Sequence, residues 1–253
     1  MFGWLRALFM YLVIGSTFIF TYFSFRFLSI TKNKNNLELK RNIFTNIFLF
    51  LFKLIFWIQI DIENQQKIID LKKEKYLFLC NHISFMDLFL LIFLSSKFKN
   101  KHLCKFVGMQ QIFDWLFVGY VLKELGMIPI KMLPNKNNQN QYCEESKKLL
   151  KERCKQELIN GNSIFMFPEG RLNDNPLKLN KIHSGAYYLS QETNTPIKII
   201  GLKNVDKIWK RYKHPTGSGK INIKIFDKNY NFKDNNEFKN EFKRIIEYWV
   251  KNI

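Results

Sequence analysis

The chain has 253 residues, with 40 Lys or Arg against 21 Asp or Glu, so its formal net charge at pH 7 is +19. This length suits one domain with a full core, or one domain with membrane-attaching segments, and is short for two folding units. The positive charge favours a polyanionic partner, either nucleic acid or an anionic membrane leaflet. Because the abundance of Lys, Asn, Ile and Phe also fits an AT-biased genome, the charge alone does not choose between them.

Two kinds of site find no support in the residue pattern. Cysteines stand at positions 80, 104, 143 and 154, with no CxxC pair and no Cys/His cluster at zinc-ligand spacing. We therefore expect free thiols in a reducing compartment and no metal centre. The basic residues are spread along the chain, and most of the 26 phenylalanines stand in apolar runs, so no nucleic-acid partner is expected.

The first element in chain order is a long apolar helix. Residues 7–25, ALFMYLVIGSTFIFTYFSF, carry no charge. As a helix they would extend about 28 Å, just enough to cross a hydrocarbon core of about 30 Å. The apolar region is longer than that of a signal peptide and no small-x-small cleavage site follows it, so we expect it to remain in the mature protein.

A second apolar stretch, IFTNIFLFLFKLIFWIQI at residues 43–60, follows a polar, basic spacer at residues 31–42. Basic residues favour the cytoplasmic side, so with a cytoplasmic domain this stretch would lie in one leaflet, with Trp57 at headgroup level. The alternative is a hydrophobic helical hairpin packed on the globular domain. We expect residues 1–62 to form the membrane-attaching region and residues 63–253 the globular domain.

Short apolar runs then alternate with helical patterns. The runs predicted as strands cover residues 76–80, 103–107, 127–130, 163–167, 197–202 and 221–226. The patterns predicted as helices cover residues 84–96, 109–124, 141–160, 183–192 and 236–251. Strands alternating with helices predict an α/β layered domain whose sheet is largely covered on both faces.

The first chemical motif is CNHISFMDLF at residues 80–89, where a strand is expected to end and a helix to begin. Ser84 and Asp87 match the S-x-x-D capping pattern, which explains Asp87 without chemistry. That pattern leaves His82 unexplained at the mouth of the sheet, within reach of Asp87. An aspartate there fixes the imidazole tautomer and stabilises the imidazolium, so the other ring nitrogen can take a proton. General-base catalysis of this kind supplies about 10² to 10⁴ in rate.

The second motif is FMFPEGRL at residues 165–172, in which a buried strand is expected to end at Pro168. Glu169, Gly170 and Arg171 then stand at the same edge of the sheet as the first motif. Glycine lets the backbone approach a ligand closely, and the planar arginine fork suits phosphate. The two motifs together favour a common site rather than two surface turns.

N-H-x-x-x-x-D followed by F-P-E-G resembles the signature of the phospholipid/glycerol acyltransferases, most closely the branch of 1-acylglycerol-3-phosphate acyltransferases. The resemblance covers roughly residues 75–205. It implies a glycerol-phosphate-acyltransferase-like α/β domain, with a mixed sheet covered by helices, preceded by membrane-associated N-terminal helices. It also implies transfer of an acyl group from acyl-CoA or acyl carrier protein to a glycerol hydroxyl.

The resemblance implies a role for each motif residue. His82 would be the general base that deprotonates the acceptor hydroxyl, and Asp87 would orient His82. Glu169, Gly170 and Arg171 would bind the glycerol and phosphate of the acceptor. We expect His82 and Asp87 to lie within hydrogen-bonding distance, with Arg171 pointing into the same cleft.

The sequence also departs from the family pattern. LGMIPIKM at residues 125–132 is similar to a block that ends in a phosphate-binding arginine, but Met132 occupies the arginine position and Lys131 precedes it. Lysine binds phosphate as a point charge and not bidentately, so the identity of the acceptor stays open. Arg171 also follows Gly170 directly, where the family often has a threonine between them.

The expected function is a membrane-associated acyltransferase that converts 1-acylglycerol-3-phosphate to phosphatidic acid on the cytoplasmic face of an anionic membrane. A thioester is already activated, so no cofactor is expected besides the acyl donor. Two alternatives stay open: an acyltransferase for another lysophospholipid, and a non-catalytic basic scaffold that binds membranes. Retention of both His82 and Asp87 favours the enzyme over the scaffold.

Overall fold

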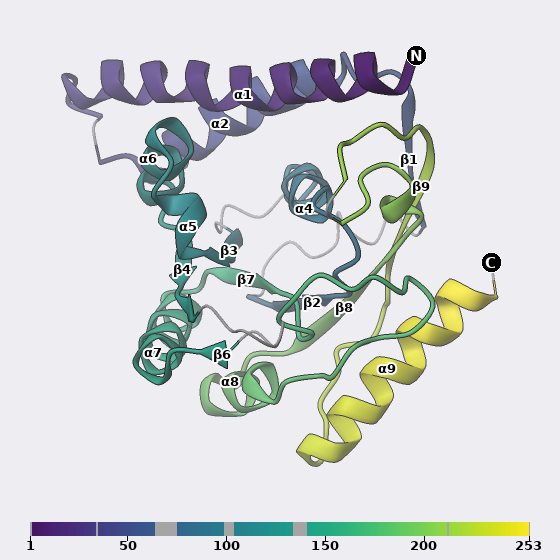
Figure 1. Cartoon of the computed structure of the whole chain (residues 1–253). Helices are drawn as coiled ribbons and strands as arrows, with labels where there is room; N and C mark the ends of the chain where they lie inside the picture. Colours follow the sequence, from purple (N-terminus) through teal and green to yellow (C-terminus); the bar gives the residue numbers. More distant parts are fainter. Residues whose placement is uncertain are drawn as a thin grey trace.

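A computed structural model describes residues 2–33, 35–63, 75–98, 104–133, 141–211 and 213–252. Its centre is a seven-stranded sheet in the order β1-β9-β8-β2-β7-β3-β4. Helices cover both faces of the sheet, with α1, α2, α4 and α6 on one side and α7, α8 and α9 on the other (Figure 1). The predicted α/β class with a mixed, covered sheet is therefore confirmed.

The strands of the large sheet are β1 (Ile58–Glu63), β2 (Leu77–Cys80), β3 (Cys104–Met109), β4 (Ile128–Ile130), β7 (Ser163–Met166), β8 (Ile197–Lys203) and β9 (Gly219–Ile225). The five strands from β8 to β4 in this order are parallel to one another. β9 is antiparallel to β8 and parallel to β1. A small separate sheet pairs β5 (Met132–Leu133) with β6 (Gln141–Tyr142). Each predicted strand is present within a residue or two of its expected bounds.

The helices are α1 (Phe2–Ser29), α2 (Leu37–Phe52), α4 (Asp87–Ser95), α5 (Gln110–Phe113), α6 (Leu116–Glu124), α7 (Glu144–Ile159), α8 (Gly185–Thr193) and α9 (Asn235–Lys251), with a short 3₁₀ turn, η1 (Val205–Lys207). The helix predicted at residues 109–124 is thus two helices. The break lets α6 fold back so closely that a Cβ on Gly119 would lie 2.0 Å from the carbonyl oxygen of Phe113. Only glycine fits that crossing.

The central strands are buried on both faces because each face has its own apolar core. In β2, Phe78 and Cys80 pack into the core beneath α1, α2 and α4, while Leu77 and Leu79 pack into the core beneath α7, α8 and α9. Successive side chains of a strand point to opposite faces, so a continuous apolar run is what a doubly covered strand requires.

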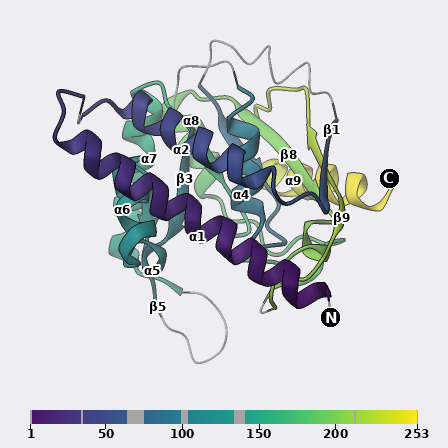
Figure 2. The same ribbon diagram turned by 90° about the horizontal axis from the view of Figure 1, so that it is seen from above.

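The N-terminal helices form a hairpin that lies along the domain, as the views from the side and from above both show (Figures 1 and 2). Met10, Phe18 and Phe25 of α1 are buried in the core that α1 shares with the sheet. Among the described residues, α1 is the one helix long and apolar enough to cross a membrane. The packed hairpin, which the sequence left as an alternative, is the arrangement that the structure has.

The structure adds two details to this region. α2 begins at Leu37, within the basic spacer at residues 31–42, and Lys40 is buried in an ion pair with Glu124 of α6. The second apolar stretch runs past α2 into β1, which pairs with β9. The division at residues 62/63, which lies within β1, stays a prediction.

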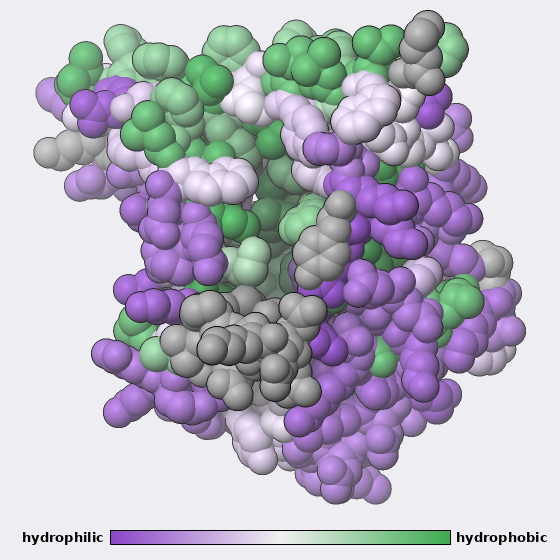
Figure 3. All heavy atoms as spheres, viewed as in Figure 1, coloured by the Kyte–Doolittle hydropathy of each residue, from purple (hydrophilic) through white to green (hydrophobic). Residues whose placement is uncertain are grey.

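The outer face of α1 exposes large apolar side chains. They include Phe2, Trp4, Leu5, Leu8, Leu12, Phe20, Phe23 and Phe27. Figure 3 shows hydrophobic residues along the top of the molecule, where α1 lies, and a hollow lined by hydrophobic residues below it. A contiguous apolar surface of this kind marks a site of contact with a membrane or another protein.

Candidate active site

The parallel strands bring both sequence motifs to one edge of the sheet. β2 lies between β7 and β8, so the residues that follow these three strands are neighbours. They are His82 after β2, residues 167–171 after β7, and residues 204–211 and 213–218 after β8. The carboxyl edge of a parallel sheet is where open α/β folds bind their ligands.

Asn81 fixes the end of β2 against β8. Its side-chain amide donates to the carbonyl of Leu202, and its side-chain oxygen accepts the N–H of the same residue, both at 2.8 Å. The asparagine side chain thus continues the hydrogen bonding between β2 and β8 past the last backbone pair, Cys80 with Ile200. The position of the next residue, His82, follows from this anchor.

His82 and Asp87 form the predicted pair. His82 Nδ1 lies 2.9 Å from Asp87 Oδ2, and the same oxygen accepts the backbone N–H groups of Ile83 at 2.7 Å and Ser84 at 2.9 Å. α4 itself begins at Asp87, three residues later than predicted, since Ser84 uses its hydroxyl to accept the N–H of Met86 and to donate elsewhere. The carboxylate accepts the N–H of Ser84, as the capping pattern predicts, but Ser84 is not the N-cap, which is Met86 without a side-chain cap hydrogen bond.

The contacts of the His82 ring assign its tautomer. A carboxylate only accepts hydrogen bonds, so Nδ1 carries the proton and Nε2 is the basic nitrogen. The ring stacks on Phe167 with centroids 4.0 Å apart and planes inclined by 11°. With 21 % of the side chain exposed, the imidazole is held between Asp87 and Phe167 but remains open to a substrate.

Asp87 is fully buried, and burial raises the pKa of its carboxyl, an effect opposed by the His82 ring and by the N–H groups of Ser84 and Ile83. Its second oxygen, Oδ1, is buried without a hydrogen-bond partner among the described residues. All of the donors therefore meet on Oδ2, the atom that touches the imidazole. A poorly solvated carboxylate here gains from a positive neighbour, so it stabilises the imidazolium when His82 takes a proton.

Glu169 lies beside His82, but its carboxylate is 1 % exposed and bonded to the protein. Oε1 accepts the backbone N–H of His82 at 2.9 Å. Oε2 accepts the side-chain amide of Asn173 and the N–H of Asn180, each at 2.8 Å. Both carboxylate oxygens are thus bonded to protein groups, one of them the backbone of His82. Direct binding of the acceptor by Glu169, which the family resemblance implied, stays a prediction.

Burial also raises the pKa of the Glu169 carboxyl, and the N–H groups of Asn180 and His82 and the amide of Asn173 oppose that rise. Gly170 has φ of +65°, in the left-handed region, and donates to the carbonyl of Phe167 in a tight turn. A side chain would strain that turn, so the glycine is required by conformation.

Arg171 follows this turn and is half-buried. Its charge lies close enough to His183 to contribute to lowering the pKa of that imidazole, after burial and nearby lysines. Its direction into the cleft stays a prediction.

Lys131 is exposed between β4 and β5, and its N–H donates to Ser146 Oγ at 2.8 Å. It stands at the same edge of the sheet as His82, but β4 is separated from β2 by β3 and β7, a distance of about 14 Å at the usual strand spacing. Met132 lies in β5. The structure thus places Lys131 away from the His82–Glu169 cluster.

The motifs did not indicate three residues that the structure places in the site. Phe167 is the last apolar residue of its run, with no signal that it would stack on a histidine. Asn173 and Asn180 stand in an irregular segment, where periodicity carries no information. Asn173 also donates its backbone N–H to the carbonyl of His82 at 2.6 Å, so this segment holds the histidine from a second side.

Comparisons with known proteins agree with the arrangement. Residues 59–203, more than half of the chain, match the family described as Acyltransferase. A chloroplastic 1-acyl-sn-glycerol-3-phosphate acyltransferase of Brassica napus is 27% identical over 141 residues, 56% of this chain and 35% of that protein. Its Arabidopsis thaliana counterpart is 28% identical over 141 residues, 56% of this chain and 34% of that protein. The chain therefore spans about a third of the length of these relatives.

The crystal structure of the 1-acyl-sn-glycerophosphate (LPA) acyltransferase PlsC from Thermotoga maritima has the same fold. The TM-score is 0.74 at 16% sequence identity, and the match covers 98% of this chain and 95% of that one. The likeness therefore includes the N-terminal hairpin as well as the sheet. From the family match, with its two motifs joined around His82, we conclude that this chain belongs to the acyltransferase family.

Proposed function

We propose that the protein transfers a fatty acyl group from a thioester to the free hydroxyl of 1-acylglycerol-3-phosphate, giving phosphatidic acid. The observation that carries this proposal is the contact of His82 Nδ1 with Asp87 Oδ2 at 2.9 Å, at a sheet edge that it shares with Glu169, Gly170 and Arg171. Family membership and the names of the plant relatives support the reaction class and the acceptor.

In the proposed step, His82 Nε2 takes the proton of the glycerol hydroxyl while its oxygen attacks the thioester carbonyl. The bond from carbon to sulfur then breaks, and the thiol of CoA or of acyl carrier protein leaves with the proton from the imidazolium. Asp87 stabilises the imidazolium between these events. Because the thioester is already activated, the step uses no metal and no cofactor.

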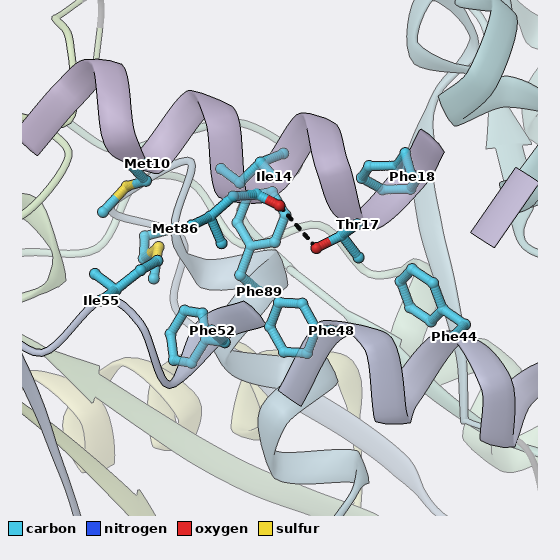
Figure 4. A pocket seen from close by; sticks show the side chains of 11 residues that line it. Met10, Ile14, Thr17, Phe18, Phe44, Phe48, Phe52, Ile55, Met86 and Phe89 are labelled. Atoms are coloured by element: carbon cyan, nitrogen blue, oxygen red, sulfur yellow. Dashed lines mark hydrogen bonds between the residues drawn. The ribbon is translucent and has the colours of Figure 1, made fainter. Parts of the chain in front are cut away.

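We further propose that the exposed face of α1 rests in an anionic leaflet on the cytoplasmic side. A narrow apolar cavity lies between the hairpin and α4, lined by Met10, Phe48, Met86 and Phe89 among others (Figure 4). Its volume of about 10 Å³ is room for roughly one water molecule, so the hairpin packs closely on the domain here and presents its outer face to the leaflet.

Acyl transfer from labelled acyl-CoA, with purified protein in anionic vesicles, tests the proposal. Lysophosphatidic acid would compete with lysophosphatidylcholine, lysophosphatidylethanolamine and lysophosphatidylglycerol as acceptors. Labelled phosphatidic acid that disappears in His82→Ala supports the reaction. Transfer to a different acceptor keeps the chemistry and changes the substrate. No transfer from acyl-CoA or from acyl carrier protein to any acceptor contradicts enzymatic function.

A further inference from the structure

The loop after β8, described at residues 204–211 and 213–218, borders the candidate base on the side opposite Glu169. It follows β8, and β8 is paired with β2, whereas Glu169 follows β7 on the other side of β2. Neither motif of the sequence includes this loop. Its cationic side chains are Lys207, Lys210, Arg211 and Lys213, against one acidic residue, Asp206.

Two contacts fix this loop to the turn that carries His82. Ser84 Oγ donates to the carbonyl of Trp209 at 2.6 Å. The Trp209 ring also stacks over Phe89 of α4, with centroids 6.4 Å apart and planes inclined by 5°. The loop therefore has a defined position beside the base.

Arg211 reaches from this loop to the segment after Glu169. Its Nη1 donates to the carbonyl of Leu172 at 3.2 Å and to Asp174 Oδ2 at 3.0 Å. The other end of the same peptide group, the N–H of Asn173, donates to the carbonyl of His82 at 2.6 Å. One peptide group thus separates the guanidinium from the backbone of the base, a path of at most about 8 Å.

We propose that Arg211 binds the phosphate of the acceptor and so helps to determine its identity, an inference that rests on the proposed function. The Arg211 side chain is 20% exposed and that of Asp174 is 63% exposed, so their ion pair is at the surface and weak. A phosphate monoester carries a charge of about −1.5 to −2 and accepts the arginine fork bidentately, so it competes well with that carboxylate. The Arg211 guanidinium lies beside the segment that directly follows Arg171.

The position of Arg211 also bears on the missing arginine of the family pattern. Met132 occupies that position, and the neighbouring Lys131 follows β4, three strands away from β2. Arg211 follows β8, the immediate neighbour of β2. A guanidinium from the loop after β8 therefore supplies positive charge closer to the base than Lys131 does.

The test compares KM and kcat for lysophosphatidic acid in uncharged mixed micelles at saturating acyl-CoA. Arg211→Gln is expected to raise KM about tenfold or more with little change in kcat, because a charged hydrogen bond to the phosphate is lost. Arg211→Lys should recover part of the loss. Lys210→Gln, which removes the same charge from an exposed neighbour, should stay within about twofold of the wild type.

Asp174→Asn separates phosphate binding from a purely structural role. If Arg211 binds the acceptor, releasing it from Asp174 should not raise KM. If Arg211 only anchors residues 172–174, Asp174→Asn should behave like Arg211→Gln, and kcat should fall with every acceptor, which would overturn the proposal. An unchanged KM in Arg211→Gln would also overturn it while leaving the proposed function intact. A wild type that acylates only acceptors without a phosphate monoester would overturn both.

Discussion

The carboxylate of Asp87 has two structural roles at the start of α4. Its Oδ2 accepts the N–H groups of Ile83 and Ser84 in the turn before α4, and it accepts the Nδ1–H of His82. The turn and the tautomer are therefore fixed by the same atom. A residue that only capped the helix would not need to reach the imidazole.

Asp87→Asn should lower kcat by about 10² to 10⁴, because an amide neither stabilises the imidazolium nor enforces the tautomer in which Nε2 is basic. KM should change little, since Asp87 is buried away from the substrate. Steady-state kinetics of acyl transfer measure both constants, and circular dichroism checks that the variant is folded. A variant with wild-type kcat would leave Asp87 with only its structural role.

Glu169→Gln distinguishes a positioning residue from a binder of the acceptor. The glutamine side chain has one acceptor oxygen and one NH₂ donor in place of two acceptor oxygens. Its NH₂ group would therefore face either the N–H of His82 or the N–H groups of Asn173 and Asn180, and the backbone of the base should shift. We expect kcat to fall at least tenfold with KM nearly unchanged, and the free energy of unfolding to fall by about 1.5 to 3 kcal/mol. A rise in KM at unchanged kcat would instead support direct binding of the acceptor by Glu169, as the family resemblance implies.

The raised pKa of Glu169 predicts how its contribution to stability depends on pH. The usual pKa of a glutamate in an unfolded chain is about 4.3. At pH values between this pKa and the raised pKa of folded Glu169, the native state binds more protons than the unfolded state. The contribution is therefore fully present below about pH 4.3 and is lost as the pH rises through the folded pKa. Urea denaturation from pH 4 to 7 should show the wild type losing stability relative to Glu169→Gln as the pH rises. A difference that is constant or grows with pH contradicts this.

At the scale of elements, periodicity predicts best where a helix or strand buries a regular face. The strands β2, β7 and β8 are foreseen because they are short, continuous apolar runs, and the amphipathic α9 is foreseen because its apolar residues recur at helix spacing. β1 is not, because IQIDIE follows an apolar stretch without a turn signal and its partner β9 lies far along the chain. The break between α5 and α6 depends on Gly119 meeting the backbone of Phe113, a tertiary contact that no local pattern shows.

The α1–α2 hairpin offers a test of membrane attachment. Leu8 and Leu12 lie on the exposed face of α1, so aspartate there should leave the fold intact but remove apolar contact with lipid. Each substitution should weaken binding to anionic vesicles about tenfold or more, as cosedimentation measures. Tyr248→Asp, an equally exposed position on α9, should bind like the wild type. Equal binding by all variants would mean that another surface contacts the membrane.

At the scale of the whole molecule, the sequence predicts which residues meet but not how each one is used. Parallel strands bring His82 and Glu169 to one edge, and the motifs are sufficient to predict that meeting. The direction of the Glu169 carboxylate toward a backbone N–H depends on the path of residues 170–180, which has no periodic pattern. The loop after β8 belongs to neither motif and has no periodic pattern, so the sequence does not predict its position beside His82.

If the His82–Asp87 pair is the base of an acyl transfer, the rate of transfer must depend on the imidazole. The initial rate at which labelled acyl groups pass from acyl-CoA to lysophosphatidic acid in vesicles tests this for wild type and His82→Gln. We expect phosphatidic acid formation that depends on the acceptor and falls by about 10² to 10⁴ in the variant, with protein of unchanged fold. Equal rates in the two proteins would contradict it, because the transfer would then proceed without His82.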